Sequence, residues 1–559
     1  MTYDSNPNTN TNRDPRASSG ETLNVLTNKF EAVTCASPHS GNTSSDESSQ
    51  PQTPRSEPVP VFRLSIDLLC SRPVFNQLIK TYLDKLYPIT PIVHRPSFAK
   101  DLDAGRETRD PAWFLMAISI CAYTLAAIPR VFSEIQSLDP DLPYRNSKQM
   151  FMQCYDIVNA GKRTHWISST SVSANHFIAT YLMAISEHLI QGDHVRGSVA
   201  LQESIGTIKA LKGHLWPAGY ERLNNIEQEI LKRCLWIAYM SSVTEAMWSP
   251  DLNFQAPNAT LFFDHVQERM PAALDDEYIT ESGNLPQSPG TVSLLTGFID
   301  RIQIHLATEC PAIPKSELLS DLADVDVPSL PRGAEELIAE ANRCKILLDR
   351  IKNVPVKVQV GPWVAFTHRG SNPDDNENLW YRDNRYVRSE QLAAQRAETI
   401  ITKSWLQSTI LEHYREVRSQ LESLMSDKHS AKPIARAPPS PPNDRHLVSA
   451  KLGLGLNTHQ YKQSIMDELL SKLSHAPLES MDPNAGILLI KLRIISFSLM
   501  EQSTLGLGDS KRTGKQLRNY LNEIMKIISD LDRHRSPETG PKGASSFPVR
   551  GSVSARRLS

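Results

Sequence analysis

The sequence predicts an all-α protein, with one large multi-helix domain between two disordered tails. Apolar residues recur at three- and four-residue steps through most of the chain between positions 61 and 533, which is the period of an amphipathic helix. Only Val354–Val360 alternates as a strand does, and a lone strand cannot build a sheet. The composition, 40% apolar and 22% charged over 559 residues, is typical of a globular protein.

Residues 1–60 are predicted to form a disordered, Ser/Pro-rich segment. Between Ala36 and Pro60 the chain has seven serines, five prolines and almost no apolar residue, so no core can offset the entropy lost on ordering. The first residues, MTYDSNPNTNTNRD, lack the apolar stretch of a secretory signal.

Helices are predicted from Val61 onward. The first is followed by Pro88, Pro91 and Pro96, which are expected to stop any helix and to hold an extended turn. Further helices are expected at about 111–128, 147–161, 171–190, 194–212 and 221–246. The run Trp113–Ile128 is too short to span a membrane and predicts a helix buried on all sides.

The helix at 221–246 is predicted to be amphipathic. Its apolar stripe consists of Leu223, Ile226, Ile230, Cys234 and Ile237. The other face carries Glu229, Arg233 and Trp236, and the i, i+4 spacing of Glu229 and Arg233 would stabilise an exposed face by a few tenths of a kcal/mol.

The C-terminal third continues the helical pattern around one proline-rich interruption. A long helix is expected at about 390–425, and its heptad-like residues from Ile410 to Leu424 are interpreted as core rather than as a surface for a partner helix. Residues 426–455 include the stretch PIARAPPSPP, which predicts a stiff exposed insertion. Helices are then expected at about 459–475, 485–502 and 515–531. The predicted parts are therefore 1–60, a helical domain at 61–425, the insertion at 426–455, C-terminal helices of the same domain at 456–533 and a disordered basic tail at 534–559.

Charge and cysteine usage argue against several classes of protein. The net charge of −2 gives no general attraction to nucleic acid or to an acidic membrane. The seven cysteines contain no CxxC pair, and the closest two, Cys121 and Cys154, are 33 residues apart, so no zinc-finger spacing is available. Cysteines inside apolar runs predict reduced thiols and an intracellular protein.

Sequence motifs for catalysis are absent or weak. Gly508–Gln516 resembles a phosphate loop superficially, but its glycine spacing is wrong and Gln516 replaces the metal-binding hydroxyl; GLGLNT at 453–458 lacks the third glycine of a dinucleotide site. Asp275, Asp276 and Glu277 could bind a cation, but we interpret them as a solvated loop or helix N-terminus. His188 and His194 are interpreted as ordinary surface histidines. We therefore predict no catalytic, cofactor-binding or metal-binding residue, and no cofactor.

Residues 82–98, YLDKLYPITPIVHRPSF, combine an aromatic start, the Tyr87-Pro88 step, Pro91 and the run from Ile92 to Phe98. This stretch resembles the opening of the fungal-specific transcription factor domain, the helical middle region of fungal zinc-cluster regulators. Five further segments resemble that domain in the expected order: EILKRCLWIAY at 229–239, RMPAALDDEYI at 269–279, SPGTVSLLTGF at 288–298, QRAETIITKSWLQSTILE at 395–412 and MDPNAGILLIKLRIISFSLM at 481–500. The resemblance covers roughly residues 62–531. It implies a helical regulatory domain without enzyme activity that acts in the nucleus and controls activity in response to a ligand or to dimerisation.

The sequence departs from that family at its N-terminal end. Relatives carry six cysteines that bind two zinc ions and place a helix in the DNA major groove. Residues 1–61 hold one cysteine and four Lys or Arg residues, so these zinc ligands are missing. The leading expectation is a pathway-specific transcription regulator, for example of a secondary-metabolite gene cluster, that acts through other transcription factors or co-regulators, as a homodimer or heterodimer, and contacts DNA only indirectly or weakly.

Two alternatives stay open. One is a conventional zinc-cluster DNA-binding factor whose zinc-cluster exon is missing from the gene model. The other is a small-molecule sensor or enzyme that uses a pocket in the helical domain.

Overall fold

The computed structural model describes residues 63–166, 172–192, 194–248, 265–309, 318–319, 333–358, 380, 385–430, 456–474, 476–504 and 511–535. The chain divides into two units, Met1–Arg63 and Leu64–Ser559, and all described residues except Arg63 belong to the second. Three predicted segments therefore lie largely or wholly outside the described residues: the N-terminal segment 1–60, the insertion at 426–455 and the tail at 534–559.

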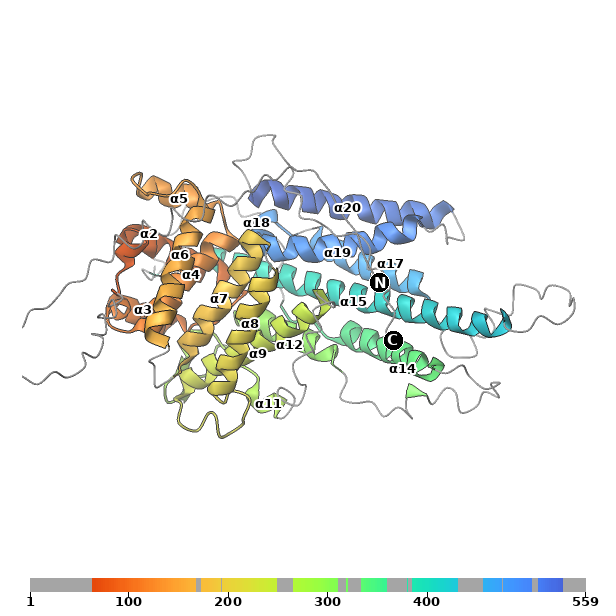
Figure 1. Cartoon of the computed structure of the whole chain (residues 1–559), viewed down its shortest axis with the longest axis horizontal. Coiled ribbons are helices and arrows are strands. Elements are labelled where there is room, and N and C mark those ends of the chain that lie inside the picture. Colours follow the sequence, from red (N-terminus) through yellow and green to blue (C-terminus); the bar gives the residue numbers. More distant parts are fainter. Residues whose placement is uncertain are drawn as a thin grey trace, which may run out of the picture. The chain divides into compact units, whose positions relative to one another are not determined.

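The described chain is almost entirely helical, as predicted (Figure 1). Its first part contains η1 (Ile66–Leu68), α2 (Arg72–Thr81), η2 (Tyr82–Leu86), α3 (Arg95–Asp103), η3 (Arg106–Thr108), α4 (Pro111–Ala127), α5 (Val131–Leu138), α6 (Ser147–Gly161), η4 (Lys162–Trp166), α7 (Ala174–Gln191), α8 (His194–Ala210) and α9 (Asn225–Trp248). The later part contains α11 (Val266–Arg269), η6 (Asp276–Tyr278), β1 (Ile279–Thr280), β2 (Gly283–Asn284), α12 (Thr296–Ala307), α14 (Ala334–Asn353), α15 (Arg385–Ser430), α17 (Thr458–Leu473), α18 (Leu478–Met481), η8 (Asp482–Asn484), α19 (Ala485–Thr504) and α20 (Lys511–Arg535).

Helix α4 is buried on all sides, as its apolar sequence predicts. Every residue from Trp113 to Ala127 is buried, and the helix packs against α2, α6 and α7. Asp110 caps its N-terminus by accepting a hydrogen bond from the backbone N–H of Trp113, and Pro111 occupies the first turn, where no N–H is needed. The helix therefore forms the centre of the N-terminal part.

The prediction that Pro96 prevents a helix is wrong. Helix α3 begins at Arg95 with Pro96 in its first turn, because proline is tolerated where the backbone N–H has no helical partner. The side chain of His94 caps this helix by accepting from the N–H of Ser97. Helices α5, α12 and α14 are also not among those predicted.

Strands lie elsewhere than the sequence pattern indicates. Residues 354–358 form no strand, and 359–360 lie outside the described residues. The short strands β1 and β2 pair antiparallel instead, with Ile279 opposite Asn284. Alternation alone misled because the backbone N–H groups of Lys357 and Val358 donate to the Asp300 carboxylate, at 2.7 and 3.1 Å, rather than to a neighbouring strand.

Helix α15 is the central helix of the C-terminal part. It packs against α12, α14, α17 and α19, and Figure 1 shows these last three running alongside it. Ile410, Tyr414, Val417 and Leu421 are buried in a hydrophobic core shared with α14, α17, α19 and α20, so the interpretation of this stripe as core is confirmed. The helix extends to Ser430, five residues past its predicted end.

The segment Leu478–Met500 has the length and composition of a membrane span, the one such segment found in the part of the chain that the structure describes. In its most apolar window, 67% of the residues are buried inside the protein. Asp482 at its start forms an ion pair of 2.5 Å with Arg130 beside α5. It is thus a core element here, one that joins the C-terminal helices to the N-terminal part.

Candidate functional site

A buried polar cluster lies where three distant segments meet, and Asp276 is its centre. The carboxylate of Asp276 accepts hydrogen bonds from Arg233 Nη2 at 2.7 Å, from the hydroxyl of Tyr87 at 2.7 Å and from the backbone N–H of Arg95 at 2.8 Å. His94 Nε2 lies 2.7 Å from the backbone oxygen of Asp276. We call these five residues, Asp276, Arg233, Tyr87, Arg95 and His94, the Asp276 cluster.

The charges of the Asp276 cluster stabilise each other. Burial raises the pKa of Asp276, but Arg233, His94 and Arg95 lower it more, to about 2. Burial also lowers the pKa of Arg233, and Asp276 more than reverses this, so its guanidinium stays charged. Both side chains are fully buried. Such a pair stabilises the fold only while both partners are present, because either charge alone would be stranded in the core.

Helix α9 has no exposed polar face at Glu229, Arg233 and Trp236, so the amphipathic prediction is wrong there. All three side chains are buried. Glu229 accepts from Lys232 at 2.8 Å and from the N–H of Ala272 at 2.8 Å, and no hydrogen bond or ion pair joins it to Arg233 among the described contacts. Tertiary partners therefore replace the i, i+4 pair that the spacing suggests.

The carboxylates at 275–277 are not a solvated loop. Asp275 is buried and accepts from the N–H of Leu294 and from Arg388 Nη2, each at 2.7 Å. Glu277 accepts from Arg95 Nη2 at 2.9 Å. Arginines and backbone groups already occupy these oxygens, so the arrangement serves to join segments rather than to hold a cation.

Gly297 allows α12 and α15 to touch. A Cβ atom on Gly297 would lie 2.7 Å from Cβ of Gln395. The Gln395 amide donates to the backbone oxygens of Pro88, at 2.8 Å, and Leu294, so one side chain joins three segments. The glycine is required by close approach and not by backbone conformation.

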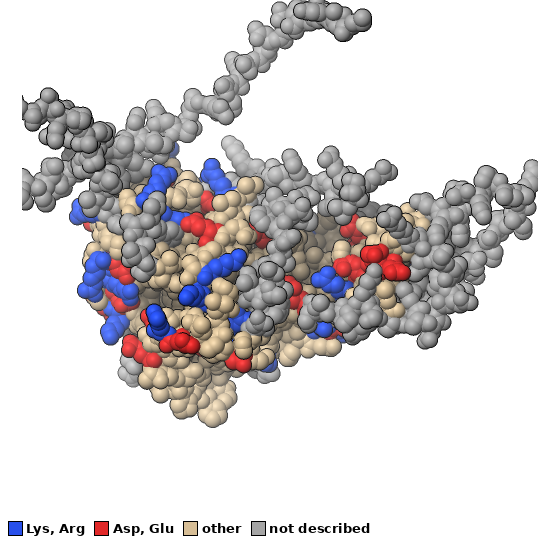
Figure 2. All heavy atoms as spheres, turned by 60° about the horizontal axis from the view of Figure 1, so that its bottom comes forward, with Lys and Arg blue, Asp and Glu red and all other residues tan. Residues whose placement is uncertain are grey.

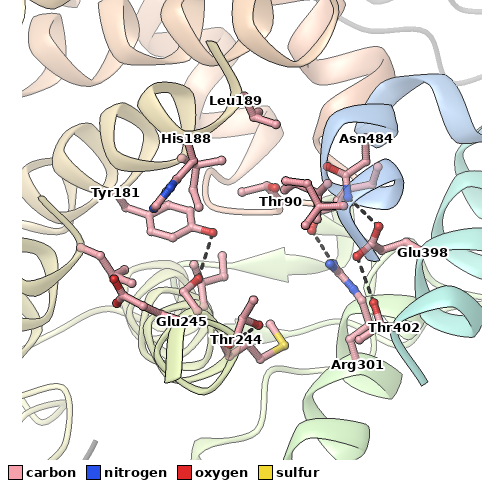
Figure 3. Close-up of a pocket in the computed structure, with 18 of the residues that line it drawn as sticks. Thr90, Tyr181, His188, Leu189, Thr244, Glu245, Arg301, Glu398, Thr402 and Asn484 are labelled. Atoms are coloured by element: carbon pink, nitrogen blue, oxygen red, sulfur yellow. Dashed lines mark hydrogen bonds between the residues drawn. The ribbon is translucent and has the colours of Figure 1, made fainter. Parts of the chain in front are cut away.

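A cavity of about 120 Å³ lies between the N-terminal helices and the C-terminal ones (Figure 3). Residues of α7, α8, α9 and α12 line one side, and residues of α15, η8 and α19 line the other. Its walls are largely apolar, formed by Ile89, Ile185, Leu201, Ile237, Met240 and Phe298 among others. Several buried charged and hydroxyl groups interrupt these walls.

Glu398 and Lys491 form an ion pair at one end of the cavity. Lys491 Nζ donates to Glu398 at 2.6 Å and to Thr402 Oγ1 at 2.7 Å, and Asn484 donates to the other carboxylate oxygen at 2.5 Å. Burial raises the pKa of Glu398, but Lys491 and Arg301 together lower it to about 2. The carboxylate is therefore ionised and fully engaged by its neighbours.

Arg301 lies at the same end without a carboxylate of its own. Its Nη2 donates to the backbone oxygen of Ile89, its Nε is buried without a hydrogen-bond partner, and no ion pair to it occurs among the described residues. Burial lowers its pKa. The neighbouring His305 donates from Nδ1 to the Arg301 carbonyl at 2.8 Å, and burial lowers its pKa to about 3, so the imidazole is neutral. This end therefore holds two cations and one carboxylate.

The other end carries Glu245 and hydroxyl groups. Glu245 is buried, neither carboxylate oxygen has a hydrogen bond of normal geometry, and burial raises its pKa while the nearby Ser198 hydroxyl lowers it less. The hydroxyl of Ser241 donates to that of Tyr181 at 3.3 Å. Figure 3 shows Tyr181 and Glu245 across the cavity from Arg301 and Glu398.

His188 is not an ordinary surface histidine. It is half-buried, lines the cavity and packs so tightly against Gly197 of α8 that a Cβ there would collide with its ring. The side chain of His194 lies outside the described residues, as do Gly508 and the glycines at 453 and 455. The interpretation of His194 as a surface histidine is therefore untested.

One group of possible metal ligands occurs in the described chain, formed by Glu340, Cys344 and His413. His413 Nε2 already lies 3.1 Å from Glu340, and Arg343 lies 3.5 Å from the same carboxylate. Burial raises the pKa of Cys344 to about 12, which disfavours the thiolate that metals bind. The group is better explained as a surface ion pair beside a core thiol.

The sequence held a signal for the cavity residues that motif searches miss. Glu398 and Lys491 are single charges inside the apolar helical runs AETII and ILLIKL, and Arg301 follows Asp300 in the largely apolar run GFIDRIQI. A charge on the buried face of a helix needs a partner or a function. Glu245 offers no such signal, because its run SSVTEAMW contains several other polar residues.

Comparison with known proteins gives one match. Residues 79–315 match the family model of the fungal specific transcription factor domain. The match includes the first four resembling segments and the whole Asp276 cluster, whereas the segments at 395–412 and 481–500 lie beyond it. Neither the curated proteins nor the solved structures gave a match to the chain.

Proposed function

The chain carries a fungal-specific transcription factor domain over residues 79–315, and we propose from this that it acts in the nucleus as a transcription regulator that reaches DNA through a protein partner. The family match is the observation on which the proposal rests. The family is one of transcription factor domains and not of enzymes. Nuclear action, the partner and the identity of the target genes are the parts that experiments must establish.

The packing of the matched region supports a folded and complete domain core. The Asp276 cluster connects residues 87–95 to Arg233 and to Asp276. Tyr87 and Asp276 are 189 positions apart in the sequence. Each of its segments also carries the resemblance to the family. The polar residues of these segments thus have a structural reason to occur together.

The cysteines support a partner for DNA binding. The 559 residues contain no CxxC pair. The five described cysteines, Cys70, Cys121, Cys154, Cys234 and Cys344, are all buried and free, and burial raises the pKa of each. Neutral core thiols cannot serve as a zinc cluster.

The visible surface charge agrees with indirect DNA contact. On the face drawn in Figure 2, basic and acidic side chains are interspersed over the described residues, without a large patch of one sign. Non-specific DNA binding by a protein depends on Lys and Arg residues gathered against the phosphates.

Chromatin occupancy of the tagged protein tests the proposal most directly. We expect occupancy at discrete promoters that disappears when a zinc-cluster partner is deleted. Partners are to be identified first by crosslinking and purification of the tagged protein from nuclei. Occupancy that persists after every co-purifying DNA-binding protein is deleted would contradict the proposal.

A matched control addresses the conventional DNA-binding alternative. Mapping the 5′ end of the transcript shows whether a CxxC-containing exon precedes Met1. We expect none, and we expect the purified chain alone to bind no promoter fragment at 150 mM salt. A preceding zinc-cluster exon would replace the partner proposal with the conventional one.

The target genes are proposed to belong to one pathway, such as a secondary-metabolite gene cluster. Transcript profiling after deletion of the gene is expected to change a small, co-located set of genes. Broad changes without such a set would refute this part alone.

The cavity favours a second property, ligand sensing within the same regulator. A pocket with apolar walls and a few convergent polar groups is the usual form of a small-molecule site. Its chemistry is specific enough to name the ligand class.

A further inference from the structure

We propose that the cavity between α12, α15 and α9 binds a small organic carboxylate, with Arg301 as the anchor for its carboxylate group. The binding claim stands on geometry alone, whereas its regulatory meaning rests on the proposed function.

The size of the cavity limits the ligand. It encloses about 120 Å³. A cavity of about 150 Å³ in another protein holds benzene, so the interior here takes a ring or chain of about six non-hydrogen atoms, and because the cavity is partly open, small substituents can extend toward its mouth. Large metabolites and cofactors with nucleotide groups are therefore excluded.

The charge of the cavity selects an anion. Glu398 accepts from Lys491 at 2.6 Å, from Asn484 at 2.5 Å and from Thr402 at 3.1 Å, and no hydrogen bond or ion pair joins it to Arg301 among the described residues. Arg301 is buried and donates to one backbone oxygen, and its Nε has no partner. A ligand carboxylate would balance the second cation and accept from the guanidinium, whose fork fits a carboxylate well.

The remaining walls describe the rest of the ligand. Ile237, Met240 and Phe298 require an apolar body. Glu245, whose buried oxygens have only the nearby Ser198 hydroxyl beside them, offers acceptors for a hydroxyl or amino group at the far end. The predicted class is therefore a compact carboxylic acid with an apolar body and a distal donor.

Because of where the cavity lies, a bound ligand would affect how two parts of the protein pack. Arg301 and Glu245 belong to the matched domain, whereas Glu398 and Lys491 belong to helices beyond it. A molecule held between them would stabilise the packing of the two parts, because a ligand that binds only the folded arrangement shifts the equilibrium toward it.

The test uses the purified full chain and three probes, benzoate, benzamide and 4-hydroxybenzoate. Benzoate and benzamide share one shape and differ in charge. We expect benzoate to raise the melting temperature, benzamide to bind about ten- to hundredfold more weakly, as for loss of a charged hydrogen bond, and 4-hydroxybenzoate to bind more tightly than benzoate. Equal binding of benzoate and benzamide, or no binding of benzoate, would overturn the proposal.

Two arginine variants locate the anchor. Arg301→Met is expected to abolish the preference for benzoate over benzamide. The control is Arg493→Met, which removes an arginine of α19 that is 38% exposed and pairs with Asp532 at the surface; it should keep the preference. If Arg301→Met does not fold, the comparison of the two probes on the unaltered chain still decides.

The outcome is separable from that of the proposed function. Probe binding is measured without DNA, nuclei or partners. A regulator that reaches DNA through a partner but does not bind benzoate would refute only this inference.

Discussion

The Asp276 cluster and the cavity are two ways of burying an arginine in one chain. Arg233 lies 2.7 Å from the carboxylate of Asp276, and that carboxylate has two further donors. Arg301 is also buried, yet its Nη2 donates to a backbone oxygen, and the carboxylate of Glu398 at the same end of the cavity is paired with Lys491. The first arrangement is complete and serves the fold, whereas the second is complete only with another anion.

The difference teaches how to separate structural from functional charges. Burial of an ionised group costs several kcal/mol unless a partner offsets it. Where the chain supplies the partner, the group joins segments. Where the chain supplies a cavity instead, the group is positioned for a ligand.

Breaking the Asp276 cluster should give the largest effect on stability. Asp276→Asn leaves Arg233 without its carboxylate, and removing one partner of a buried pair costs about 3–5 kcal/mol. Urea unfolding followed by circular dichroism measures the loss. Asp67→Asn, which alters an exposed carboxylate that accepts from Ser65, is the matched control and should change the free energy of unfolding by less than about 0.5 kcal/mol. A loss below 1 kcal/mol in Asp276→Asn would show that the cluster is not a stabilising centre.

Acidic pH should lower the free energy of unfolding, because Asp276 and Glu398 become protonated. Their pKa values fall from 3.8 and 4.5 to about 2 on folding. A carboxyl group with a lower pKa in the folded state binds protons more readily when unfolded, so its stabilisation is complete above about pH 5 and is lost as the pH falls toward 2. Each group contributes about 2–3 kcal/mol by this linkage.

Unfolding free energies measured from pH 7 to pH 2 check this prediction. The slope below pH 5 should be smaller in Asp276→Asn than in the unaltered chain. Identical slopes in the two proteins would mean that Asp276 does not titrate on unfolding in this range.

A smaller effect is expected at the contact of α12 with α15. Gly297→Ala places a Cβ 2.7 Å from Gln395 Cβ, so packing must shift, at about 1–3 kcal/mol. Gly206→Ala is the control, since a Cβ there meets nothing within 4 Å and alanine favours a helix. We expect the melting temperature to fall in the first variant and to hold or rise in the second. An equal change in the melting temperature of both variants would contradict the role of Gly297 in the close approach of α12 and α15.

The sequence predicts the fold better than the sites. Helix periods and proline positions locate α4, α6, α7, α9, α15, α17, α19 and α20. They fail at α3 because Pro96 fits a first helical turn as well as a break, and at α9 because Glu229 and Arg233 find partners far away in the chain. Asp275 and Asp276 look solvated for the same reason, since their arginines lie at positions 388 and 233.

The candidate cavity could not be predicted from the sequence. The cavity needs residues from Ile89 to Lys491 in one place, and no local pattern shows that Arg301 shares a wall with Glu398. The family resemblance identifies the segments but not their meeting point. What the sequence does contain is a set of charged residues within apolar helical runs, and the structure brings Arg301, Glu398 and Lys491 together.

Paired arginine replacements test the central difference most directly. We would measure the free energy of unfolding of Arg233→Met and Arg301→Met by urea titration, each with and without benzoate. Arg233→Met should cost about 3–5 kcal/mol because Asp276 is stranded. Arg301→Met should cost less than about 1 kcal/mol, because an apolar side chain of similar length replaces an unbalanced buried cation, and it should no longer be stabilised by benzoate. Equal losses in the two variants, or undiminished stabilisation of Arg301→Met by benzoate, would contradict the account.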